Sequence, residues 1–105
     1  MKEEVIKNLK TESYKNLHFI LGVVNDKDVF AMLSQLPKKA TYYFTNAQIQ
    51  RALPAHELKQ LGAKYKLKGN SYTSVKIALK AAKKQYKKGD LIFIGGSNFV
   101  VAEIL

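Results

Sequence analysis

Apolar and polar residues alternate along this chain in two periods, one typical of helices and one typical of strands. The segment 2–10 carries Val5, Ile6 and Leu9 at helical spacing. The next apolar stretch, residues 17–24, is almost unbroken, and such a run is typical of a strand buried on both faces of a parallel sheet. The pattern therefore predicts a first helix followed by a central strand.

Helical spacing returns after this strand, and a second strand follows. Apolar residues at i, i+3, i+4 and i+7 predict a helix over residues 29–36. We expect Asp26 as its cap, Asp28 in its first turn and Pro37 at its end. Residues 40–45 are rich in aromatic and β-branched side chains, which predicts the second strand.

The second half of the chain repeats this alternation. Pro54 opens a third helix, and the residues at 66–68 form at most a short edge strand before a turn at 69–70 (Gly-Asn). Thr73 or Ser74 caps a long helix that ends near residue 87, and residues 91–94 form the last strand. The inner stripe of the long helix is expected to comprise Val75, Leu79, Ala82 and Tyr86.

Strands that alternate with helices imply parallel strands joined by right-handed crossovers. The fold class is therefore α/β, a three-layer Rossmann-like domain with a mainly parallel sheet. We expect one domain over residues 1–105. Because the chain begins with a helix, we also expect that the first strand of the domain is missing from its front.

Composition excludes several kinds of chemistry. The chain has no cysteine, so disulfides, thiolate metal sites and cysteine nucleophiles are excluded. No apolar run approaches the roughly 18–20 residues that a membrane span needs. We expect a cytoplasmic protein that does not bind membranes.

The net charge of +10 raises the question of a polyanionic partner. Six lysines fall between Lys76 and Lys88. The one aromatic residue among them, Tyr86, is expected on the inner stripe, so the lysines do not form a stacking platform for bases. The pattern favours a solvated helix face over a nucleic-acid surface, and nucleic-acid binding stays as an alternative.

Ligands of open α/β sheets bind beyond the carboxyl ends of the strands. The sharpest candidate there is Gly95-Gly96-Ser97, which turns the last strand into a final helix over residues 98–104. Two glycines allow close approach of a ligand, and Ser97 at a helix start could receive a carboxylate or phosphate. The alternative is that the glycines only make the turn and Ser97 only caps the helix.

Lys27 is the second candidate at a strand end. It could hold a carboxylate by charge, or it could pair loosely with Asp26 or Asp28 in solvent. His18 and His56 lack partners at metal-ligand spacing, and we interpret both as structural. No metal site and no dinucleotide-binding or phosphate-loop motif is predicted.

Four segments, taken together, resemble the folylpolyglutamate synthases of the Mur ligase superfamily. Residues 21–28 (LGVVNDKD) resemble the G-x-x-x-D-K-D segment of these enzymes. Residues 42–45 (YYFT) and 51–54 (RALP) resemble their next strand and loop. Residues 89–103 (GDLIFIGGSNFVVAE) resemble their closing strand, turn and helix, and this match is the strongest.

The resemblance implies the carboxy-terminal domain of a bifunctional folylpolyglutamate synthase/dihydrofolate synthase, an ATP-dependent ligase. Such enzymes use ATP and Mg²⁺ to phosphorylate a carboxylate of folate or dihydropteroate, which the amino group of glutamate then attacks. By position, Lys27 and Ser97 match residues near the glutamate. Asp26, Gly95 and Gly96 would support the loops that carry them.

The family's phosphate loop, central ATPase domain and magnesium ligands have no counterpart in this sequence. Its D-x-x-H-N-x-x-G segment would lie just before residue 1. We therefore expect the missing ATPase portion to be the partner of this chain, and the isolated chain to lack ATPase and ligase activity. A peptidoglycan Mur ligase domain stays as a further alternative.

Overall fold

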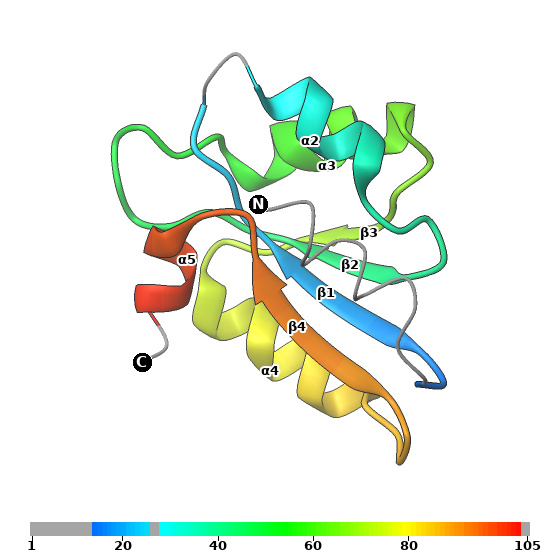
Figure 1. Cartoon of the computed structure of the whole chain (residues 1–105). Coiled ribbons are helices and arrows are strands. Elements are labelled where there is room, and N and C mark those ends of the chain that lie inside the picture. Colours follow the sequence, from blue (N-terminus) through cyan, green and yellow to red (C-terminus); the bar gives the residue numbers. More distant parts are fainter. Residues whose placement is uncertain (1–13, 26–27, 104–105) are drawn as a thin grey trace.

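The computed structural model describes residues 14–25 and 28–103 of the chain. The helix predicted over residues 2–10 and the loop residues Asp26 and Lys27 lie outside the described residues. The described part alternates strands and helices in the predicted order (Figure 1). In chain order the elements are β1 (Leu17–Leu21), α2 (Val29–Gln35), β2 (Thr41–Phe44), α3 (Ala55–Lys64), β3 (Lys68–Ser71), α4 (Val75–Gln85), β4 (Leu91–Gly95) and α5 (Asn98–Ala102).

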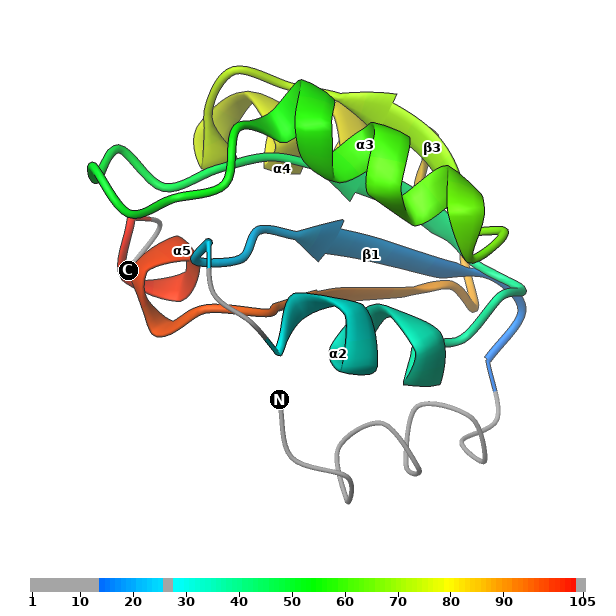
Figure 2. The ribbon, with the colours of Figure 1, turned by 90° about the horizontal axis from the view of Figure 1, so that it is seen from above.

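The four strands form one parallel sheet in the order β3-β2-β1-β4. From β1 the chain moves outward to β2 and β3 through α2 and α3, which cover one face of the sheet (Figures 1 and 2). It then returns through α4 on the opposite face and adds β4 on the other side of β1. The direction of winding thus reverses between β1 and β4, which confirms the predicted three-layer α/β class.

The core follows the alternation of side chains along the strands. Phe19 of β1 is buried on the side of α2 and α3, where its ring stacks on that of Tyr42 with ring centroids 5.2 Å apart. Ile20 and Tyr43 point to the other face and pack against Ala78 of α4. All five residues of β1 are buried. The unbroken apolar run therefore predicted the central strand correctly.

The turn predicted at 69–70 is wrong, because both residues belong to β3. Gly69 pairs with Tyr42 of β2. A Cβ atom on Gly69 would lie only 1.8 Å from the Tyr42 carbonyl oxygen. Glycine stands here because two backbones approach closely, not because the chain turns. The change of direction occurs earlier, at Lys66, whose φ is 63°.

The inner stripe predicted for the long helix is correct at Val75 and Ala82, which are both fully buried. It is wrong at Tyr86, which is 46% exposed. Helix α4 ends at Gln85, and Tyr86 takes an extended ψ of 134° that carries it off the helical period. At the other end, the Ser74 hydroxyl accepts a hydrogen bond from the amide of Ile77, so Ser74 is the cap.

Candidate functional site

The segments that follow β1, β2 and β4 meet at one end of the sheet, which we call the strand-end edge. It comprises residues 22–25, 45–53 and 95–97. The Gly22 amide donates to the Gly95 carbonyl (3.3 Å), and the Thr45 amide donates to the Leu21 carbonyl (2.9 Å). Because winding reverses between β1 and β4, the chain segments diverge here, as they do at the ligand sites of doubly wound sheets.

The turn after β4 packs directly on the end of β1. Gly96 has a φ of +103°, a conformation that L side chains rarely adopt. A Cβ atom at this position would lie 2.4 Å from the Gly22 carbonyl oxygen. The predicted tight turn is therefore correct, and it brings the backbone of residues 95–97 against the strand-end edge.

Hydrogen bonds fix the loop after β2 at this edge. The Asn46 side-chain oxygen accepts from the Ala55 amide (3.0 Å) at the start of α3. The Gln48 amide donates to the Glu103 carboxylate (2.5 Å), and the Gln48 side chain donates to the Thr73 carbonyl (3.1 Å). One loop thus links the starts of α3 and α4 to the end of α5, so movement of any one of them is resisted by the others.

Arg51 joins the same edge from the loop after β2. Its carbonyl accepts from the Asn25 amide at 2.7 Å, and the neighbouring Leu53 amide donates to the Val23 carbonyl at 3.0 Å. The Arg51 side chain is exposed. The structure thus places an arginine beside the segment 22–25.

Thr45 is a polar residue at this edge that the sequence placed at a strand end without assigning it a role. It is fully buried, and its hydroxyl has no hydrogen-bond partner among the described residues. The sequence shows a polar residue at the end of an aromatic strand. Only the structure shows that the hydroxyl of this residue is buried without a hydrogen-bond partner among the described residues.

The predicted site residues Gly95, Gly96 and Ser97 all lie at the strand-end edge. The Ser97 carbonyl accepts from the Val100 amide (3.2 Å) as α5 begins. Helix α5 has only five residues, so the backbone of the turn, more than a helix dipole, would contact an anion here. The other predicted residues, Asp26 and Lys27, lie outside the described residues.

A second polar cluster lies at the opposite, amino ends of the strands. His18 Nε2 lies 2.8 Å from the Asp90 carboxylate, and His18 Nδ1 lies 2.9 Å from the Tyr43 hydroxyl. The Asp90 carboxylate also accepts from the Asn16 side chain and the Lys87 amide. This cluster joins β1, β2 and the turn before β4, which supports the structural interpretation of His18.

Acid should destabilise the chain through Asp90. Hydrogen bonding to His18 holds the pKa of Asp90 below its ordinary value of 3.8. The ionised carboxylate therefore stabilises the fold above about pH 4, and this contribution is lost as the pH falls through the lowered pKa. In urea unfolding followed by circular dichroism, Asp90→Asn should be less stable than the wild type at pH 7. The difference should shrink below pH 4; a constant difference would contradict this assignment.

Among the described residues, no group of three or more histidine, cysteine, aspartate or glutamate side chains could hold a metal ion. Within the same part of the chain, no helix is long and apolar enough to cross a membrane. The structure thus defines a doubly wound α/β domain with a polar strand-end edge.

This class of domain can be compared with known proteins. No family model matches the chain. The chain is 30% identical over 106 residues to a dihydrofolate synthase/folylpolyglutamate synthase of Buchnera aphidicola (Schizaphis graminum subspecies), with 97% of the chain covered. It spans about a quarter of that relative, 24% of its length, and matches the C-terminal region of these enzymes.

Solved structures share the fold. Escherichia coli FolC in complex with DHPP and ADP superposes with a TM-score of 0.85 at 24% identity, over 97% of this chain and 24% of that one. A bifunctional folylpolyglutamate synthase/dihydrofolate synthase with Mn, AMPPNP and L-glutamate bound gives 0.77 at 17% identity, over 96% of this chain and 24% of that one. The matches favour the folate ligases over the nucleic-acid and peptidoglycan alternatives.

Proposed function

We propose that this chain is the glutamate-side C-terminal domain of an ATP-dependent folate–glutamate ligase of the cytoplasm, and that residues 1–105 form one such domain. The observation that carries the proposal is the match of 97% of the chain to the C-terminal region of dihydrofolate synthase/folylpolyglutamate synthases. The strand-end edge is consistent with it, because it gathers polar loops at the place where such sheets bind ligands.

In this proposal the chain binds and orients glutamate. The Ser97 hydroxyl donates a hydrogen bond to a glutamate carboxylate, and the Lys27 ammonium group attracts it by charge. Gly95 and Gly96 keep the turn narrow enough for close approach, and Asp26 orients the loop that carries Lys27. The binding of L-glutamate by a structural neighbour supports a glutamate substrate.

The activation of the folate or dihydropteroate carboxylate belongs to the rest of the enzyme. Structural neighbours contain ADP, or AMPPNP with Mn, and we assign ATP and Mg²⁺ to an ATPase portion that acts with this chain. When bound there, they supply phosphoryl transfer to the carboxylate. The strand-end edge then holds the glutamate amino group in position for attack, which is a contribution of orientation.

Reassembly tests this function. Mixing the chain with the ATPase portion of a relative should give ADP release that depends on folate, glutamate and Mg²⁺, whereas the isolated chain should give none. Ser97→Ala and Lys27→Ala should each raise the KM for glutamate about tenfold or more, since a hydrogen bond to a charged group contributes about 1.5–3 kcal/mol.

Lys59→Ala is the matched control, because Lys59 is an exposed lysine of α3 and has no proposed role. Its KM for glutamate should equal that of the wild type. A reassembled enzyme whose KM is unchanged by both Ser97→Ala and Lys27→Ala would overturn the residue assignments. Magnesium-dependent ADP release by the chain alone would overturn the proposal that ATP and Mg²⁺ bind to a separate ATPase portion.

A further inference from the structure

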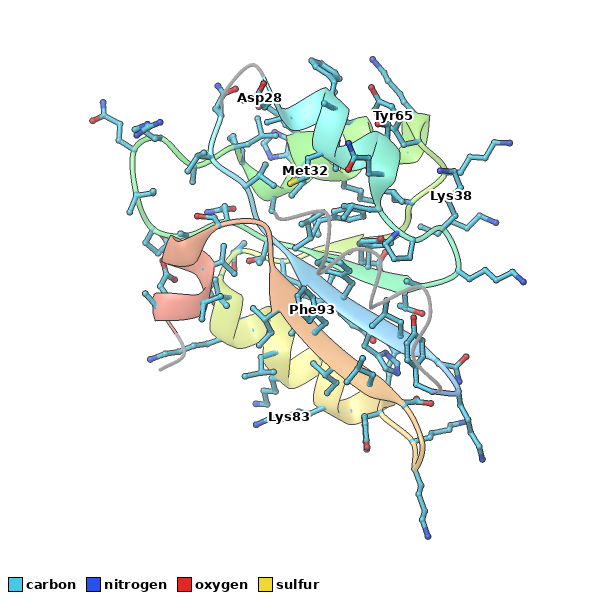
Figure 3. All side chains as sticks on the ribbon, viewed as in Figure 1. Asp28, Met32, Lys38, Tyr65, Lys83 and Phe93 are labelled. Atoms are coloured by element: carbon cyan, nitrogen blue, oxygen red, sulfur yellow. The ribbon has the colours of Figure 1, made fainter. Side chains whose placement is uncertain are left out.

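One face of α4 carries a cluster of positive charge. The helix contains four lysines and no acidic residue. Lys76, Lys80 and Lys83 are exposed and line one open hollow of about 260 Å³, together with Leu79. Figure 3 shows Lys83 extending from α4 away from the sheet. We call these three lysines with Leu79 the α4 lysine face.

These lysines are uncompensated within the described residues. The ion pair found there is His18–Asp90, at the far end of the sheet from the start of α4. Three like charges on adjacent turns repel one another. An anionic chain laid along the helix would relieve this repulsion, so the face fits a ligand with several negative charges.

The α4 lysine face begins beside the strand-end edge. Val75, the first residue of α4, packs in one buried cluster with Ala47 of the loop after β2 and Val100 of α5. Lys76 follows directly, and the face continues along α4 away from that edge (Figure 1). A chain that leaves the strand-end edge on this side of the sheet therefore meets the lysines in order.

The spacing of the lysines suits a chain of linked glutamates. Lys76 and Lys80 are four residues apart on the helix, which is about 6 Å along its axis. Glutamates joined through their side-chain carboxyl groups have two methylenes more per repeat than an ordinary peptide, so the extended repeat is about 6 Å. Each repeat leaves one free carboxylate, so neighbouring carboxylates can contact lysines on neighbouring turns.

A nucleic acid fits this face less well. Aromatic side chains on which bases could stack are absent from the hollow, which is lined by three lysines and one leucine. The exposed aromatic residue nearest in sequence, Tyr86, lies beyond the end of α4, with its ring 6.5 Å from that of His18. Because the α4 lysine face has positive charge but no surface on which bases could stack, it favours a flexible chain of carboxylates over a nucleic acid as its ligand.

We propose that the α4 lysine face binds the growing oligoglutamate tail of the folate substrate as it leaves the strand-end edge. This inference rests on the proposed ligase function for the identity of the tail. The α4 lysine face then contacts only substrates that already carry several glutamates, and it does not contribute to the addition of the first glutamate.

Direct binding by the whole chain is the first test. Side-chain-linked pentaglutamate should bind in calorimetry at low salt, and an increase from about 20 to 200 mM salt should weaken binding about tenfold through screening. The triple variant Lys76→Gln, Lys80→Gln, Lys83→Gln should lose at least tenfold in affinity. The triple variant Lys38→Gln, Lys59→Gln, Lys64→Gln removes the same charge from exposed lysines elsewhere and should retain binding.

Absence of pentaglutamate binding, or equal loss in both triple variants, would overturn the proposal. Tighter binding of a single-stranded RNA of equal charge would replace it with the nucleic-acid interpretation. In the reassembled enzyme, the α4 triple variant should leave KM for monoglutamyl folate unchanged and raise KM for a tetraglutamyl folate about tenfold. If the reassembled enzyme is active but the α4 triple variant affects both folates equally, only the tail site is overturned. If the reassembled wild type has no ligase activity, the proposed function is overturned, and calorimetry alone decides the tail site.

Discussion

Gly96→Ala is expected to destabilise the chain by about 3 kcal/mol and to disorder the strand-end edge. A non-glycine residue held at an unfavourable positive φ costs about 1–3 kcal/mol, and Gly96 has a φ of +103°. The added methyl group would also lie 2.4 Å from the Gly22 carbonyl oxygen and 2.8 Å from the Leu21 side chain. Because a backbone oxygen cannot rotate away as a side chain can, β1 and the turn must move apart.

Gly89→Ala is the matched control for this substitution. Gly89 also has a positive φ, of +95°, but a Cβ atom there would meet only the flexible Lys15 side chain, at 3.0 Å. Urea unfolding followed by circular dichroism should therefore show a smaller loss for Gly89→Ala. In the reassembled enzyme, only Gly96→Ala should raise the KM for glutamate. Equal stability of the two variants would show that contact between Gly96 and Gly22 is not important.

Gly69→Ala should separate the edge strand β3 from the sheet and destabilise the chain by about 3 kcal/mol or more. The Cβ atom would overlap the Tyr42 carbonyl oxygen, at 1.8 Å, so the two strands cannot keep their present register. The loss then includes the ladder hydrogen bonds of β3 and the packing of the segment that follows it. The cost exceeds that of an ordinary strand glycine, because the obstacle is backbone.

Hydrogen exchange measured by NMR would locate this effect. The Tyr72 amide donates to the Phe44 carbonyl at 2.8 Å just after β3, and it should lose protection in Gly69→Ala. Amides of β1 should keep their protection at moderate temperature. Asn70→Ala is the control, because Asn70 is an exposed neighbour in the same strand and should change stability by less than about 1 kcal/mol. Protected Tyr72 in Gly69→Ala would refute the expected separation.

The sequence predicted the elements whose residues are buried and missed what depends on distant partners. Strands β1 and β2 were found because burial selects apolar and aromatic residues along them. Strand β3 has the sequence KGNS and is largely exposed, so no periodicity marks it and its glycine resembles a turn residue. A glycine required by a neighbouring backbone has the same local appearance as one required by a turn.

The candidate site was predictable to the extent that topology fixes it. Gly95, Gly96 and Ser97 follow a strand in an α/β pattern, and the carboxyl ends of parallel strands share one edge. The burial of the Thr45 hydroxyl without a hydrogen-bond partner among the described residues could not be predicted, because both depend on the folded structure. The pair His18–Asp90 was missed for the same reason, since its two members are 72 residues apart in sequence.

The separation of the two polar clusters has a consequence for protein engineering. His18 and Asp90 lie at the amino ends of β1 and β4, whereas Gly95, Gly96 and Ser97 lie at the carboxyl end of β4. A strand of five residues spans about 16 Å, so substitutions at one end leave the contacts at the other intact. Exposed residues of the strand-end loops could therefore be varied, with Gly96 and the loop hydrogen bonds retained, while the far end keeps the domain folded.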